Sequence, residues 1–226
     1  DVYAALLTDE SRNQMITSDV LRVLGEGRSP ILLTERREHL EFFGNLAGVA
    51  RAECELFDAM GGSGTGFVNA DDPRLGPRAR NLRRRVSYGF TAGGVRGKLA
   101  GVGTDGCAAF FVKRRGKRVF RVGLRTPGLH AAANALAATA VGLAFGVPAG
   151  DIARALGSFA SVGKRMEVIH SGGVTILNDT YTANPDSVLS ALRTLGGMST
   201  VGRKIVVLGD MLELGTASRS EHERIG

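Results

Sequence analysis

Apolar positions along this 226-residue chain recur with two periods, and segments of the two kinds alternate. Helical spacing, with apolar residues returning every three or four positions, occurs at residues 50–60, 129–145, 148–159 and 185–195. Strand-like runs occur at residues 66–69, 86–90, 107–112, 118–122 and 204–208. Residues 168–177 read as a hairpin around two glycines. The pattern predicts an α/β fold, with a mixed sheet, flanking helices and a β-hairpin subregion.

The first 47 residues read as a separate helix–strand–helix unit. Residues 18–24 have helical spacing and stop at glycines, residues 30–34 are a short apolar run, and residues 35–46 are amphipathic. The character of the sequence changes near Gly48, which predicts a boundary there.

The net charge of +7 is unevenly distributed. Residues 74–125 contain 15 Lys and Arg against one acid, Asp105, whereas residues 1–47 contain 5 basic and 8 acidic residues. A basic segment attracts a phosphorylated substrate or a nucleic acid, although exposed hairpins with solvated charges have the same composition. No aromatic residues alternate with these charges, as a single-strand-binding surface requires. Nucleic acid is therefore the less favoured partner.

Bulk composition is that of an ordinary globular protein, with 43% hydrophobic and 23% charged residues. No apolar run is long enough to span a membrane, so no membrane partner is expected. The two cysteines, Cys54 and Cys107, lack metal-binding spacing, and no metal ligand is assigned. A reduced, cytoplasmic location is expected.

An enzyme that uses ATP often holds the triphosphate in a loop of the form G-x-x-x-x-G-K-[ST]. That motif is absent from the 226 residues. Its nearest counterpart, the glycine-rich run at residues 61–66, has no lysine after Gly66 and precedes a strand-like segment. We interpret it as a flexible turn.

Polar residues suited to nucleotide binding lie near the start of the helix at residues 129–145. His130 and Asn134 are four residues apart and share one helical face. The amide of Asn134 can pair with the donor–acceptor edge of adenine. Further along, Arg165 leads into a strand, and an arginine at a strand edge can contact a phosphate through two nitrogens.

The richest group of candidates lies in the loop after the hairpin. Asp179 can accept hydrogen bonds from ribose hydroxyls, Tyr181 can stack, and Asn184 can bond a base. A plain loop with side-chain-to-backbone turns is the alternative. Pro185 near the first turn of the next helix suits that position, where a missing N–H has no effect.

Three segments in this order resemble the Mur ligase family of peptidoglycan synthesis. They are TPGLHAAANALAA at residues 126–138, LNDTYTANPDS at 177–187 and VVLGDMLELG at 206–215. The pattern is most similar to members that add D-alanyl-D-alanine to UDP-N-acetylmuramoyl-tripeptide. The resemblance implies ATP and Mg²⁺ as cofactors, UDP-N-acetylmuramoyl-peptide and D-alanyl-D-alanine as substrates, and a role in cell-wall biogenesis, cell shape and cell division.

The resemblance also implies roles for individual residues. His130, Asn134, Asp179, Tyr181 and Asn184 would bind ATP, and Arg165 would contact its γ-phosphate as the catalytic candidate. Two family asparagines are replaced, by Ala131 and Thr182. Asp210, Glu213 and His222 would belong to a C-terminal domain that closes over ATP. The family's magnesium-associated lysine is replaced by Glu53.

A second resemblance concerns residues 1–47, where GRSPILLTERREHL is similar to the second motor domain of superfamily 2 helicases. We therefore expect a helicase-like segment at 1–47, a partial Mur ligase central domain at 48–199, and the start of a Rossmann-like C-terminal domain at 200–226. The expected function is that of a Mur ligase-like fragment that does not ligate alone. A nucleic-acid-associated module and a non-functional fusion are the alternatives.

Overall fold

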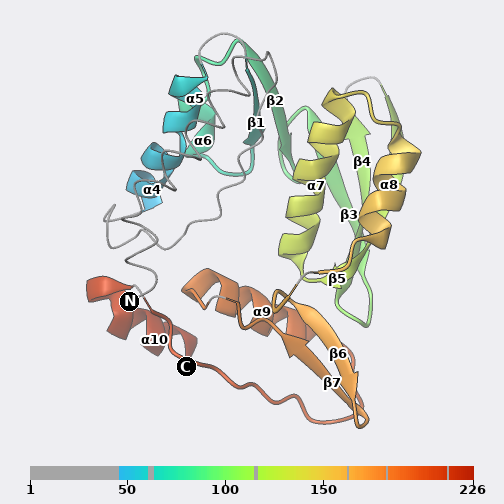
Figure 1. Cartoon of the computed structure of the whole chain (residues 1–226), viewed down its shortest axis with the longest axis vertical. Helices are drawn as coiled ribbons and strands as arrows, with labels where there is room; N and C mark the ends of the chain where they lie inside the picture. The colour runs from blue at the N-terminus through green and yellow to red at the C-terminus, as the bar shows by residue number, and fades with distance from the viewer. Residues whose placement is uncertain (1–45, 61–63, 115–116, 162, 182, 213) are drawn as a thin grey trace, which may run out of the picture.

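The computed structural model describes residues 46–60, 64–114, 117–161, 163–181, 183–212 and 214–226 (Figure 1). The elements expected before residue 46 lie outside these ranges. In the part of the chain that the structure describes, no helix is both long and apolar enough to cross a membrane.

A five-stranded sheet forms the main body of the molecule. Its strands are β1 (Thr65–Asn69), β2 (Arg84–Gly89), β3 (Val95–Val102), β4 (Cys107–Arg114) and β5 (Lys117–Pro127), in the order β1-β2-β3-β4-β5. The pairs β1–β2 and β2–β3 are parallel, and β3–β4 and β4–β5 are antiparallel. The predicted mixed sheet is confirmed, but β3 was not predicted as a separate strand.

Helices flank this sheet in two groups. The long helices α7 (Leu129–Ala144) and α8 (Ala149–Ser158) lie across the β3–β5 part, and the shorter α4 (Leu46–Glu53), α5 (Glu55–Ala59) and α6 (Leu75–Arg78) lie beside β1 and β2 (Figure 1). The helix expected at residues 50–60 is present in two pieces, α4 and α5, which meet at Cys54.

The core lies between the sheet and α7. Alternate residues of β4, including Phe110 and Val112, are buried against an alanine-rich face of α7. The small side chains let the helix approach the sheet closely, and a Cβ on Gly97 would lie 2.7 Å from the Phe90 ring and 3.0 Å from Leu136. Phe90 meets Phe110 edge to face, with ring centroids 5.6 Å apart.

Asp71 ties the loop after β1 to the turn between β2 and β3. Its carboxylate accepts hydrogen bonds from the backbone N–H groups of Phe90 (2.6 Å), Thr91 (2.9 Å) and Ala92 (3.0 Å), and from the Thr91 hydroxyl (2.5 Å). Burial opposes ionisation of this carboxyl, but the four donors outweigh it and lower the pKa of Asp71 below its ordinary value.

The C-terminal part contains a two-stranded sheet and two helices. The strands β6 (Glu167–Ser171) and β7 (Val174–Asn178) form the predicted hairpin, followed by α9 (Pro185–Gly197), the short 3₁₀-helix η1 (Gly215–Ala217) and α10 (Ser218–Ile225). Helices α9 and α10 pack around a small cluster of Val188, Met211 and Leu214.

The prediction of a strand at residues 204–208 is wrong. These residues run as an extended segment without strand pairing, between α9 and α10 (Figure 1). Their side chains are exposed, with Val207 at 92%. A parallel strand gains backbone hydrogen bonds only from a neighbouring strand, and in the described ranges no strand pairs with this segment.

Both thiols sit where ionisation is disfavoured. Burial, together with the adjacent Asp105 carboxylate, raises the pKa of Cys107 to about 12. Burial also raises the pKa of Cys54. Because the thiolate is the reactive form, we expect iodoacetamide at pH 8 to alkylate Cys107 at least about 100-fold more slowly in the folded chain than in the urea-unfolded chain. Cys54 should also react more slowly in the folded chain. Mass spectrometry measures the alkylation rate at each cysteine. Equal rates in the folded and unfolded chains would contradict this expectation.

Candidate functional site

Two loops, one before β6 and one after β7, are joined at the open end of the hairpin. The Asp179 carboxylate accepts a hydrogen bond from the Met166 backbone N–H at 3.0 Å. The Tyr181 backbone N–H donates to the carbonyl oxygen of Lys164 at 3.0 Å. The structure therefore brings together Arg165, Asp179 and Tyr181, three candidates that lie up to sixteen positions apart in the sequence.

The loop before β6 has an unusual backbone. Lys164 and Met166 have φ angles of 61° and 51°, in the left-handed region that residues other than glycine rarely adopt. Such conformations persist where the surroundings fix them. Here the Met166 side chain is buried, and the Glu167 carboxylate accepts from the Lys164 backbone N–H and from the Asn178 amide, both at 3.2 Å. Glu167 was not among the sequence candidates.

Arg165 lies between these two left-handed residues, and its side chain is directed onto Tyr181. The guanidinium carbon is 4.0 Å from the centroid of the Tyr181 ring, which is a cation–π contact. Both side chains are exposed. Stacking uses the face of a guanidinium, and its N–H groups lie in the plane of that group.

Asn184 has a structural role in addition to its candidate role. Its side-chain oxygen accepts from the Ser187 backbone N–H at 2.9 Å, and the Ser187 hydroxyl pairs with the Asn184 backbone N–H at 3.0 Å. This reciprocal pair is a capping box that starts α9, with Pro185 in the first turn. The role of Asn184 at a base remains a prediction.

His130 connects the start of α7 to α9. Its Nδ1 lies 3.0 Å from the Ser190 hydroxyl. A backbone bond from Ser199 to the carbonyl of Thr104 at 2.9 Å fixes the end of α9 to the β3–β4 turn. Asn134, one turn further along α7, is exposed. Ser190 was missed by sequence reasoning, since serine in mid-helix carries no signal of its partner.

Of the three C-terminal candidates, Asp210 and His222 are not part of this group. His222 accepts from the Met211 backbone N–H through Nε2 at 3.2 Å and donates from Nδ1 to the Ser218 carbonyl at 2.8 Å. It therefore holds the segment that follows Asp210 against α10. Asp210 is exposed, and Glu213 lies outside the described residues.

The magnesium prediction gains no structural support. Among the residues that the structure describes, no cluster of three or more His, Cys, Asp or Glu side chains is arranged to hold a metal ion. Glu53 ends α4, and the helix is interrupted at Cys54 directly after it.

Comparisons with known families agree with the fold. Residues 28–142 match the Mur ligase middle domain, and residues 164–226 match the Mur ligase glutamate ligase domain. The first range alone is just over half of the chain. The chain belongs to the Mur ligase family.

The individual relatives that match this chain share one enzyme name within the family. The chain is 33% identical to the UDP-N-acetylmuramoyl-tripeptide–D-alanyl-D-alanine ligase of Mycobacterium leprae, covering 87% of this chain and 43% of that protein. It is 29% identical to the Bacillus subtilis ligase of the same name, covering 92% and 45%. The chain thus spans less than half the length of these relatives.

Solved structures show the same similarity. MurF from Acinetobacter baumannii matches with a TM-score of 0.74 and 29% identity, covering 83% of this chain and 41% of that one. MurF from Thermotoga maritima in complex with ADP matches with a TM-score of 0.73 and 25% identity, covering 83% and 43%.

The helicase resemblance of residues 1–47 gains no support. The middle-domain match begins at residue 28, and the Bacillus subtilis match covers more of the chain than residues 48–226 contain. The Mur ligase similarity therefore extends into the segment that we expected to be separate. The expected domain boundaries near Gly48 and at 199 remain predictions.

Proposed function

We propose that this chain forms the nucleotide-binding part of a ligase that adds D-alanyl-D-alanine to UDP-N-acetylmuramoyl-tripeptide. The names of the relatives support this reading, because the proteins from Mycobacterium leprae and Bacillus subtilis carry that activity in their names. The family match to both the middle and the glutamate ligase domains supports it further. The product would enter peptidoglycan synthesis.

The paired loops around Arg165 are the observation that carries the proposal. A strained turn presents this arginine on Tyr181, beside the Asp179 carboxylate. In the proposed site Arg165 binds a phosphate of ATP, and Asp179 and Tyr181 contact the nucleoside. Asn134 on α7 would recognise adenine. A structural relative with ADP bound is consistent with a nucleotide site in this fold.

The residues fit the nucleoside side of ATP better than the phosphate side. The glycine-rich phosphate loop with its lysine is absent from the 226 residues. A bound ATP would supply the phosphoryl group that activates a carboxylate for ligation, but one arginine without such a loop holds a triphosphate only weakly. We therefore expect weak nucleotide binding and no ligation by this chain alone.

Nucleotide binding is tested by thermal unfolding with and without 5 mM ATP. A ligand that binds only the folded state raises the midpoint. We expect a small rise that is reduced by Arg165→Ala for ATP but not for adenosine, because the arginine serves the phosphate. Asn134→Ala should reduce the rise with both ligands, since it serves the base.

Asn81→Ala is the matched control, because Asn81 is an exposed asparagine outside the candidate site. It should leave both shifts unchanged. A shift that survives Arg165→Ala and Asn134→Ala alike would locate the nucleotide elsewhere and contradict the proposal. Separately, turnover by the chain with UDP-N-acetylmuramoyl-tripeptide, D-alanyl-D-alanine and Mg-ATP would contradict the expectation that it does not ligate alone.

A further inference from the structure

The face of the β3–β5 sheet opposite α7 and α8 carries a group of cations around one aromatic ring. Cross-strand pairing places Lys98, Phe111 and Arg121 directly opposite one another, in a row across the three strands. Two residues along, Arg96 pairs with Lys113. All five side chains are exposed, and the Phe111 ring is 40% exposed. Alternate residues on the same strands, such as Phe110, point to the core.

These cations stand close together on the sheet. Adjacent strands are about 4.8 Å apart and alternate residues about 6.6 Å apart, so the four backbone positions that carry these cations fall within roughly 12 Å. Like charges directly opposite in a sheet, such as Arg96 and Lys113, are destabilising. In the described ranges no ion pair is formed by any of the four. The electrostatics of this face therefore favour a polyanion.

The ring of Phe111 has open space on one side. The next row across the sheet is Gly101, Ala109 and Gly123, which together carry one methyl group. A Cβ on Gly101 would meet nothing within 4 Å, and one on Gly123 would meet only the Arg121 guanidinium at 3.8 Å. A planar group therefore has room beside Phe111, above this row of small residues and next to the Arg121 guanidinium.

We propose that this face binds single-stranded nucleic acid. One base stacks on Phe111, and the phosphates on either side of it contact Lys98 and Arg121. Stacking of a base on an aromatic side chain, flanked by cations that track the backbone, is the usual chemistry of single-strand binding. Along the sequence no aromatic residues alternate with the charges. In the folded sheet, however, strand pairing places Phe111 between Lys98 and Arg121.

An anionic bilayer is the main competing partner for a basic face. Membrane contact needs an apolar group that inserts, and leucine serves that purpose as well as phenylalanine. A base needs the aromatic plane itself. Phe111→Leu and Phe111→Tyr therefore separate the two partners, since leucine keeps the apolar bulk and tyrosine keeps the ring.

The test is fluorescence anisotropy of the full chain with labelled dT12 and rU12 in 50 mM NaCl. We expect Lys98→Glu/Arg121→Glu to weaken binding at least about ten-fold and to flatten its salt dependence. Phe111→Leu and Gly123→Val should each weaken it about five-fold or more, and Phe111→Tyr should stay within about two-fold of the parent. Gly123→Val fills the open row without changing charge or ring.

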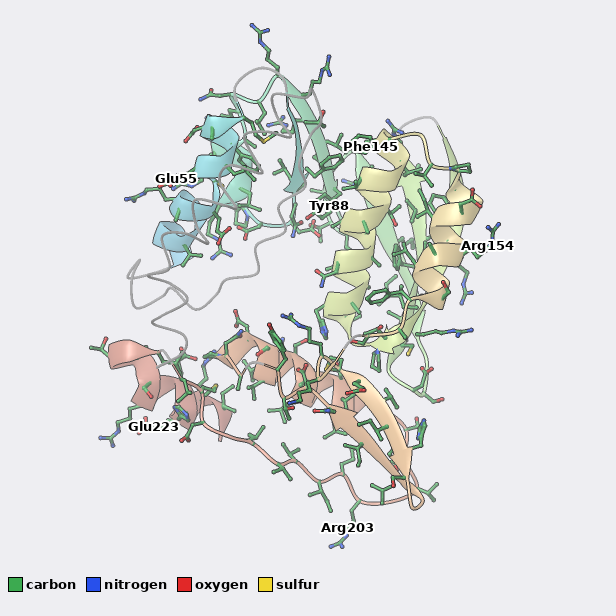
Figure 2. All side chains as sticks on the ribbon, viewed as in Figure 1. Glu55, Tyr88, Phe145, Arg154, Arg203 and Glu223 are labelled. Atoms are coloured by element: carbon green, nitrogen blue, oxygen red, sulfur yellow. The ribbon has the colours of Figure 1, made fainter. Side chains whose placement is uncertain are left out.

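Arg154→Glu/Arg203→Glu is the charge-matched control, because both side chains are exposed and point away from the body of the molecule in Figure 2. Arg154 lies on α8, which covers the other face of the sheet, and Arg203 lies outside the sheet. It should change affinity less than about two-fold. Equal losses in both charge-reversed variants would overturn the proposal, as would unchanged binding of Phe111→Leu. A third outcome would also overturn it: vesicles with 30% phosphatidylglycerol capture both the parent chain and its Phe111→Leu variant, and neither dT12 nor rU12 binds.

Discussion

Truncation of Phe110 to alanine is expected to destabilise the protein by about 3–5 kcal/mol, the range measured for buried phenylalanines. Phe110 is 0% exposed, packs at the centre of the main core cluster and meets Phe90 edge to face. Its removal leaves a cavity between the sheet and α7, where most of the buried α7 side chains are alanines and Leu136 is already packed. Equilibrium unfolding in urea, followed by circular dichroism, measures the loss.

Phe111→Ala is the matched control, one residue along the same strand. Its ring faces solvent and is 40% exposed, so its truncation should cost about 1 kcal/mol or less. If the two variants lose similar stability, the alternation of β4 between core and solvent is misassigned. A variant of Phe110 too unstable to purify, beside a well-folded Phe111 variant, gives the same answer as a large measured loss.

Most of the fold could be predicted because its elements have strong local signals. The helix at residues 129–145 and the hairpin at 168–177 lie within a residue or so of their observed ends. The strand β3 was missed because its sequence, VRGKLAGV, mixes glycines and cations and has no clear strand pattern. Its antiparallel partner, residues 107–114, comes later in the chain and pairs with it by folding back. The false strand at 204–208 shows the reverse, since its apolar run lacks a neighbour to pair with.

Sequence reasoning recovered part of the candidate site. The proximity of Arg165 to Tyr181 was not predictable, because it depends on two left-handed residues, Lys164 and Met166, that carry no glycine signal. Glu167 was overlooked because its role is to bond backbone and amide groups of the loop rather than a ligand. The capping function of Asn184 could have been read from the serine three residues later and the proline between them.

Substitution of Asp71 by asparagine is expected to cost about 1–2 kcal/mol at pH 7. Hydrogen bonds to a charged acceptor are the stronger kind, but Asp71 is exposed and solvent weakens them. Both carboxylate oxygens accept, one from Phe90 and the other from Thr91 and Ala92. An amide keeps one acceptor and turns an NH₂ group toward a backbone N–H. The turn between β2 and β3 would lose its anchor to the loop after β1.

The cost should depend on pH in a defined direction. The pKa of Asp71 is lowered in the folded state, so its carboxylate contributes stability above the unfolded pKa of about 3.9, and that contribution disappears as pH falls through the folded value. Urea unfolding of the parent and of Asp71→Asn from pH 6 to pH 2.5 should give curves that are parallel above about pH 5 and converge below about pH 4. Asp105→Asn is the control, because Asp105 accepts one backbone bond, from Cys107, that an asparagine can replace. A gap between parent and Asp71→Asn that stays constant down to pH 2.5 would mean that the charge of Asp71 contributes nothing, and that only the shape of the side chain is needed in this turn.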